Sequence, residues 1–99
     1  MSSLTRHYVQ RPSGDRYTIQ YHPQPDGTYK LFCTEHPHNP YSTAVVDCHL
    51  YPDSQICVSS SFRVDSLDKA KAVATAFIDG YSHYVRSGVF PNGAKKVHV

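Results

Sequence analysis

The sequence has no tryptophan, one methionine, three cysteines and a charged fraction of only 18% across its 99 residues. It also lacks any apolar run near the roughly 20 residues that a membrane-spanning helix needs. The start, Met1-Ser2-Ser3-Leu4, holds no apolar stretch, so no secretory signal is predicted. Tyrosine, histidine, proline, serine and threonine take the place of the missing charges, and this is not a disordered composition. We therefore expect one folded domain with no membrane partner.

The chain carries little net charge, because 10 Lys and Arg stand against 8 Asp and Glu and leave +2. This excess is too small and too scattered to predict nucleic-acid binding. Strands followed by an Ala-Lys-rich helix also occur in double-stranded-RNA-binding domains, which place lysines at the helix start to meet phosphate. Here Asp65 and Asp68 stand at that start and would repel phosphate. The sequence therefore disfavours a nucleic-acid partner.

The three cysteines are an odd number and cannot all pair within one chain. Without a secretory signal they predict reduced thiols and a cytoplasmic location. Cys33 and His36 have the spacing of a zinc-ligand pair, but no second compact pair follows them. We therefore predict no metal site and no cofactor.

Alternating residues predict a β-hairpin in the first half of the chain. In residues 16–22, Tyr17, Ile19 and Tyr21 fall on one face, which is the period of a half-buried strand. The turn signal Asp26-Gly27 follows, and residues 28–34 return as a second strand. Antiparallel pairing of these two strands is expected.

The other non-helical segments carry weaker signals. Residues 1–15 are predicted to form a polar, irregular arm with a short extended piece at residues 7–9, and residues 94–99 a basic tail. The single domain then spans residues 16–93. The β-branched pair Val45-Val46 predicts a third strand over residues 43–51, Pro52 sets a turn at residues 51–54, and residues 55–59 are a short fourth extended piece.

A long amphipathic helix is predicted from residue 66 onward, with Asp65 as its N-cap and Ser87-Gly88 as its end. Apolar residues recur there at spacings of three and four, namely Leu67, Ala70, Ala74, Phe77, Tyr81 and Val85. Eight tyrosines without tryptophan predict a core whose aromatic residues keep one polar end near water. The expected fold class is α+β, with a small antiparallel sheet of three to four strands and one long helix on a face.

Cys57 and His49 are the candidate site residues. His49 precedes the predicted turn and Cys57 follows it, so the two can face each other, and a His–Cys pair supports nucleophilic chemistry. A partly exposed thiol beside a turn can react, but a free cysteine is more often a buried and inert core residue. Cys33 and Cys48 lie within predicted strands and are expected in the core.

Residues 48–58, taken with their flanks, resemble the ubiquitin-conjugating fold, and are closest to its prokaryotic relatives. Bacterial members of that family carry a His-x-Tyr-x-Asp-Gly-x-Leu-Cys-Leu segment. The matching residues here are His49, Tyr51, Asp53, Ile56, Cys57 and Val58. Residues 37–41 resemble the proline turn before the third strand, and residues 84–93 resemble the end of the bacterial helix. The resemblance covers about residues 17–93, as an abbreviated member.

This resemblance implies a thioester-forming transferase and a place in bacterial defence operons. Cys57 would take the C-terminal acyl group of a ubiquitin-like protein from an activating enzyme and pass it to an amine. His49 would orient the loop or tune the thiol, while Tyr51 and Asp53 would support the loop.

Other functions stay open at this point. A degenerate member would keep the fold without the activity. A similar or unrelated scaffold would serve as a non-catalytic protein-binding module, either an adaptor or a phage-encoded inhibitor, with an unidentified protein partner. The edge strand of so small a sheet can also pair with a second copy, which leaves a homodimer open.

Overall fold

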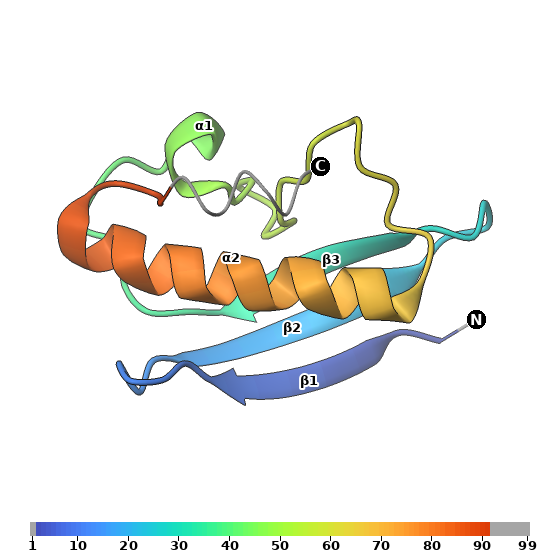
Figure 1. The fold of residues 1–99 in the computed structure, drawn as a ribbon, viewed down its shortest axis with the longest axis horizontal. Coiled ribbons are helices and arrows are strands. Elements are labelled where there is room, and N and C mark those ends of the chain that lie inside the picture. Colours follow the sequence, from blue (N-terminus) through green and yellow to red (C-terminus); the bar gives the residue numbers. More distant parts are fainter. Residues whose placement is uncertain (1, 92–99) are drawn as a thin grey trace.

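The computed structural model describes residues 2–91. Its main elements are a three-stranded antiparallel sheet and one long helix (Figure 1). The strands lie in the order β1 (Leu4–Val9), β2 (Arg16–Pro23) and β3 (Tyr29–Glu35). The helix α2 (Leu67–Ser87) follows and lies across one face of the sheet. This architecture confirms the predicted α+β class. The predicted basic tail, residues 94–99, lies outside the described residues.

The hairpin of β2 and β3 forms where the alternating pattern predicted it. Tyr17, Ile19 and Tyr21 of β2 are fully buried beneath α2, which confirms the predicted core face. In the connecting turn the N–H of Gln24 donates to the Thr28 carbonyl at 2.8 Å, and Gly27 has a φ of 85°. Glycine adopts this left-handed conformation without steric cost.

The extended piece predicted at residues 7–9 is part of a longer edge strand, β1, so the prediction of an irregular arm is wrong for residues 4–9. β1 pairs antiparallel with β2, from Leu4 opposite Tyr21 to Val9 opposite Arg16. Only Leu4 and Tyr8 of β1 pack against the core, so the stretch has too few apolar residues to show a strand period by itself. The strand forms because β2 supplies its backbone partners.

Side-chain hydrogen bonds and an ion pair connect the loop between β1 and β2 to the last turns of α2. Both guanidinium nitrogens of Arg86 donate to the Asp15 carboxylate, at 2.6 and 3.0 Å. This bidentate contact lowers the pKa of Asp15 below its usual value. A side-chain bond from Gln10 to Asp79 at 3.1 Å joins the same two elements.

Both ends of α2 are capped, and the N-cap lies one residue later than predicted. The N-cap is Ser66 and not Asp65 as predicted: the Ser66 hydroxyl accepts the Lys69 N–H at 3.1 Å. Asp65 instead pairs with the Lys69 ammonium at 2.8 Å. The predicted end is confirmed, since Gly88 is left-handed with a φ of 78° and donates its N–H to the Tyr84 carbonyl.

Gly80 stands in the middle of α2, where glycine costs a helix about 1 kcal/mol relative to alanine. The ring of Phe90 lies directly against its backbone, and an added Cβ would overlap that ring. The chain after the helix therefore folds back onto α2 through a close contact of Phe90 with Gly80, and a side chain at residue 80 would displace the Phe90 ring.

Four tyrosines are fully buried, which differs from the expectation that their polar ends stay near water. They are Tyr17, Tyr21, Tyr81 and Tyr84. Their hydroxyls bond within the protein: Tyr17 with Ser82 at 2.7 Å, and Tyr84 to the Ser42 carbonyl at 2.7 Å. Burial raises the pKa of Tyr81 to about 12. These internal bonds let the core accommodate phenol groups without water.

Candidate functional site

The chain before the candidate site forms a helical turn where a third strand was predicted. α1 (Val45–Cys48) replaces the predicted strand over residues 43–51, and Val46 is 80% exposed. The N–H groups of Cys48 and His49 donate to the carbonyls of Ala44 and Val45. Cys48 is thereby turned into the core, and this burial outweighs the strand propensity of the valine pair.

Residues 49–57 form a tight hairpin beyond the edge of β3. Leu50 pairs with Ile56, and the Cys57 N–H donates to the His49 carbonyl at 2.9 Å. A second isolated pair joins Phe32 of β3 to Gln55. The predicted fourth extended piece at residues 55–59 is thus reduced to these two bridges. The hairpin brings His49 and Cys57 opposite each other along the backbone, as the turn between them predicted.

The turn of this hairpin repeats the turn between β2 and β3. In both, a proline and an aspartate precede a left-handed residue, and the aspartate Oδ1 accepts an N–H at 3.0 Å, from Gln55 for Asp53 and from Thr28 for Asp26. The left-handed residue is Gly27 in one turn and Ser54, with a φ of 78°, in the other. Ser54 therefore occupies a position where a side chain strains the backbone.

Replacing Ser54 by glycine is expected to raise the free energy of unfolding by about 1 kcal/mol, because the left-handed strain disappears. The matched control is Gly27→Ser, which should lower it by a similar amount. A Cβ at residue 27 meets no other atom within 4 Å, so this control tests the backbone alone. Urea unfolding followed by circular dichroism measures both, and a destabilised Ser54→Gly variant would contradict the strain.

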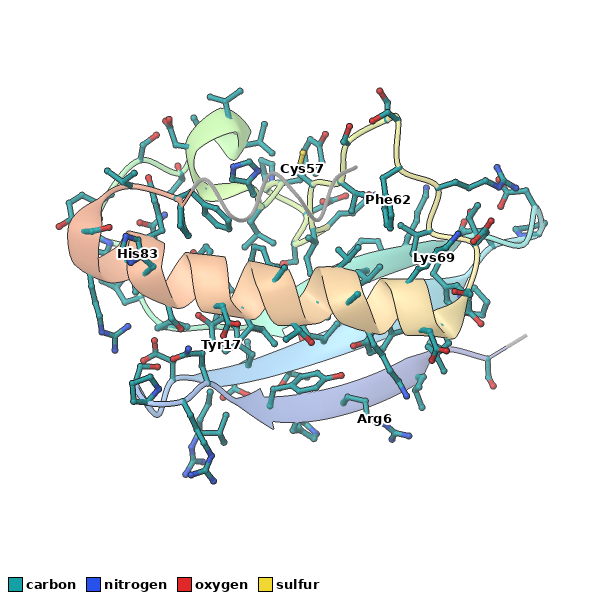
Figure 2. All side chains as sticks on the ribbon, viewed as in Figure 1. Arg6, Tyr17, Cys57, Phe62, Lys69 and His83 are labelled. Atoms are coloured by element: carbon teal, nitrogen blue, oxygen red, sulfur yellow. The ribbon has the colours of Figure 1, made fainter. Side chains whose placement is uncertain are left out.

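Cys57 is the most accessible of the three free thiols. Cys33 and Cys48 are buried, as predicted, whereas Cys57 is half-buried. Burial raises the pKa of Cys33 to about 12, and its Sγ lies 3.2 Å from the Glu35 carbonyl. Figure 2 shows Cys57 on the opposite side of the molecule from β1. Only Cys57 is therefore placed to meet a reagent without opening the core.

Tyr51 contacts the Cys57 thiol with its phenol. A side-chain hydrogen bond with Cys57, reinforced by charge repulsion from it, raises the pKa of Tyr51. Tyr51 is 41% exposed, so the phenol and the thiol meet at the surface. The resemblance assigned Tyr51 to loop support, whereas in the structure its hydroxyl forms a hydrogen bond with the Cys57 thiol. Asp53 lies in the turn, where its carboxylate accepts the Gln55 N–H.

His49 meets Cys57 through its backbone carbonyl, while its ring packs against Phe90. The two ring centroids are 4.3 Å apart and the planes are inclined by 52°. His49 itself is left-handed, with a φ of 61°, because it caps α1. Phe90 was not among the predicted site residues. No short motif links it to His49, because it arrives from the far end of α2.

No three histidine, cysteine or carboxylate side chains among residues 2–91 are grouped so that they could hold a metal ion. In the same part of the chain, neither helix has the length and apolarity needed to cross a bilayer.

Comparisons of the chain with protein-family models, curated proteins and solved structures give no match. The ubiquitin-conjugating resemblance of residues 17–93 therefore stays a prediction drawn from the residues themselves.

Proposed function

We propose that the protein is a thiol acyl carrier of the ubiquitin-conjugating type, with Cys57 as the nucleophile. The observation that supports this proposal is the position of Cys57: it is the one partly accessible thiol of the three. It also lies in a hairpin opposite His49, in contact with the Tyr51 phenol. Three free thiols fit a reducing compartment, so the proposal includes a cytoplasmic location.

The proposed reaction has two transfers. The Cys57 thiolate attacks the activated C-terminal carbonyl of a ubiquitin-like protein, and the thiolate of the activating enzyme leaves. An amine then attacks the Cys57 thioester, so that a C–N bond forms, the C–S bond breaks and the amine gives its proton to solvent. The Tyr51 hydroxyl donates a hydrogen bond to the sulfur as negative charge returns to it.

Transfer from a chemical thioester tests the proposal without an activating enzyme. The protein is incubated with a glycine-ended peptide thioester of mercaptoethanesulfonate, and the acyl adduct is followed by intact mass. A synthetic peptide of residues 49–57 carries the same thiol without the fold. We expect the folded protein to react at least about tenfold faster than this peptide, because the fold orients the thiol.

Cysteine variants identify the sulfur that carries the acyl group. Cys57→Ala should form none, Cys57→Ser should form an ester that resists dithiothreitol, and Cys33→Ala should behave as the wild type. The proposal fails if the wild type reacts no faster than the peptide, or if Cys57→Ala still gains the acyl group.

A non-catalytic protein-binding module is the second candidate. The face of the sheet away from α2 favours it, because it carries a polar network across all three strands. The His7 imidazole lies 3.0 Å from the Thr18 hydroxyl, which donates to Glu35 at 2.7 Å. An accessible but unreactive Cys57 in the thioester assay would favour this candidate over the acyl carrier.

A further inference from the structure

The two edges of the sheet differ in whether their backbone groups are used. On the outer edge of β3, the Cys33 N–H donates to the Ser54 carbonyl and the Tyr29 N–H to the Val64 carbonyl. The Leu31 carbonyl accepts the Ile56 N–H on the same edge. β1 pairs with β2 on one side, and in Figure 1 no other element of residues 2–91 lies along its other side.

The groups that β1 leaves unpaired follow from its register. The Gln10 N–H donates to the Asp15 carbonyl, and Val9 lies opposite Arg16. Because inward and outward groups alternate along an antiparallel strand, Thr5, His7 and Val9 direct both backbone groups away from β2. Within residues 2–91 no hydrogen bond joins these groups to another residue.

This edge lacks two of the features that keep edge strands apart, namely a proline and a bulge. β1 contains no proline, and its pairing with β2 is regular, whereas the pairing of β2 with β3 has a shift at Thr18/Ile19. Proteins usually protect an exposed edge with a proline, a bulge, charged side chains or a covering segment, and of these β1 carries only the charge of Arg6. A regular, open strand of six residues is a template for another strand.

We propose that a second copy of this chain pairs with β1, antiparallel and about a two-fold axis at His7. In this register His7 faces His7 of the partner subunit, and Thr5 faces Val9 of the partner subunit. Every outward N–H and C=O of Thr5, His7 and Val9 then has a partner. The two three-stranded sheets become one continuous sheet across the dimer.

The side chains complement each other in this register. Arg6 and Tyr8 share the face of β1 that carries the core residues of β2, and each Arg6 lies opposite Tyr8 of the partner subunit. A guanidinium over a phenol ring is a favourable cation–π pair, and the two-fold axis makes it twice. Figure 2 shows Arg6 projecting from the free side of β1, where the partner would lie.

The neighbouring symmetric registers are worse. A two-fold axis at Arg6 sets the two guanidinium groups opposite each other, and directly opposed like charges destabilise a strand pair. An axis at Tyr8 leaves Thr5 beyond the pairing. In the register centred on His7, the other face pairs β-branched Thr5 with Val9 of the partner subunit. This contact would cover Val9, which is 57% exposed.

A single pair of short strands makes a small interface, below the roughly 1,200 Å² of stable complexes. The dimer is therefore expected to be weak and to form at high protein concentration. Sedimentation equilibrium between about 10 µM and 1 mM covers the range in which such small interfaces associate.

The variant Thr5→Pro tests the edge. The Thr5 N–H points away from β2, so proline removes a bond to the partner and leaves the ladder with β2 intact. We expect the dissociation constant to rise at least about tenfold, since each dimer loses two such bonds. The matched control, Thr5→Ala, keeps the N–H and should dimerise nearly as the wild type, and circular dichroism verifies that both are folded.

A crosslink tests the register independently of Thr5→Pro. In a Cys57→Ala background, His7→Cys places two thiols across the axis, with Cα atoms at about 5.5 Å, within disulfide reach. Oxidation should then give a covalent dimer, whereas Lys71→Cys, on the exposed side of α2, should not. The inference is overturned by a monomer throughout the concentration range, by Thr5→Pro dimerising as well as Thr5→Ala, or by equal crosslinking of both cysteine variants.

Discussion

Replacing Tyr81 by alanine is expected to lower the free energy of unfolding by about 3–5 kcal/mol. Tyr81 is only 1% exposed, and its ring lies 5.2 Å from Phe77 and 6.3 Å from Tyr17 between centroids. The ring therefore joins α2 to β2, and its removal leaves a cavity between them. Domains of this size are stable by about 5–15 kcal/mol, so the variant should lose a large share of its free energy of unfolding.

Urea unfolding followed by circular dichroism measures this loss, and Tyr41→Ala is the matched control. Tyr41 contacts Tyr84 with its ring at 5.9 Å, but it is 46% exposed. Its removal exposes little new surface and should cost about 1 kcal/mol or less. Equal losses for the two variants would mean that Tyr81 does not hold the helix to the sheet.

The elements that the sequence predicted correctly carry their signals locally. The Asp26-Gly27 turn, the alternation of β2 and the stripe of α2 each depend on neighbouring residues, and all are present. The N-cap lies one residue later than predicted. Aspartate and serine are both common N-cap residues, and only the structure shows that Ser66 accepts the Lys69 backbone N–H while Asp65 pairs with the Lys69 ammonium.

The elements that were predicted wrongly depend on distant contacts. β1 is a strand because β2 lies beside it, and its own residues show no clear period. The Val45-Val46 pair favours a strand wherever a partner strand is available. Here the hairpin of residues 49–57 takes the edge of β3, so the valines form a helical turn instead.

In the candidate site, too, the local contact could be predicted from the sequence and the contacts that depend on side-chain direction or distant residues could not. The opposition of His49 and Cys57 could be predicted, because the turn at Pro52 fixes which residues face each other. The contact of the Tyr51 phenol with the thiol depends on side-chain direction across the hairpin. The packing of His49 against Phe90 depends on how the chain returns after α2, and Gly80 is the one residue whose position marks that return.

Alkylation by iodoacetamide at neutral pH is expected to modify Cys57 at least about 100-fold faster than Cys33 or Cys48. Two effects slow the labelling of the buried thiols, the first at Cys33 and the second at both Cys33 and Cys48. The thiolate is the reactive form, and burial raises the pKa of Cys33 to about 12, so almost none of it is ionised at neutral pH. Reagent also reaches Cys33 and Cys48 only when the core opens, because both are buried.

Quenched time points, digestion and mass spectrometry give the rate at each cysteine, and the same labelling in guanidinium provides the control. Once the chain is unfolded the three rates should agree within about threefold, because the fold no longer distinguishes the thiols. Labelling of Cys33 or Cys48 as fast as Cys57 in the native protein would contradict the accessibility of Cys57. Fast labelling of Cys57 together with no gain over the peptide in the thioester assay would separate access from activation, and would leave the thiol exposed but without acyl-carrier function.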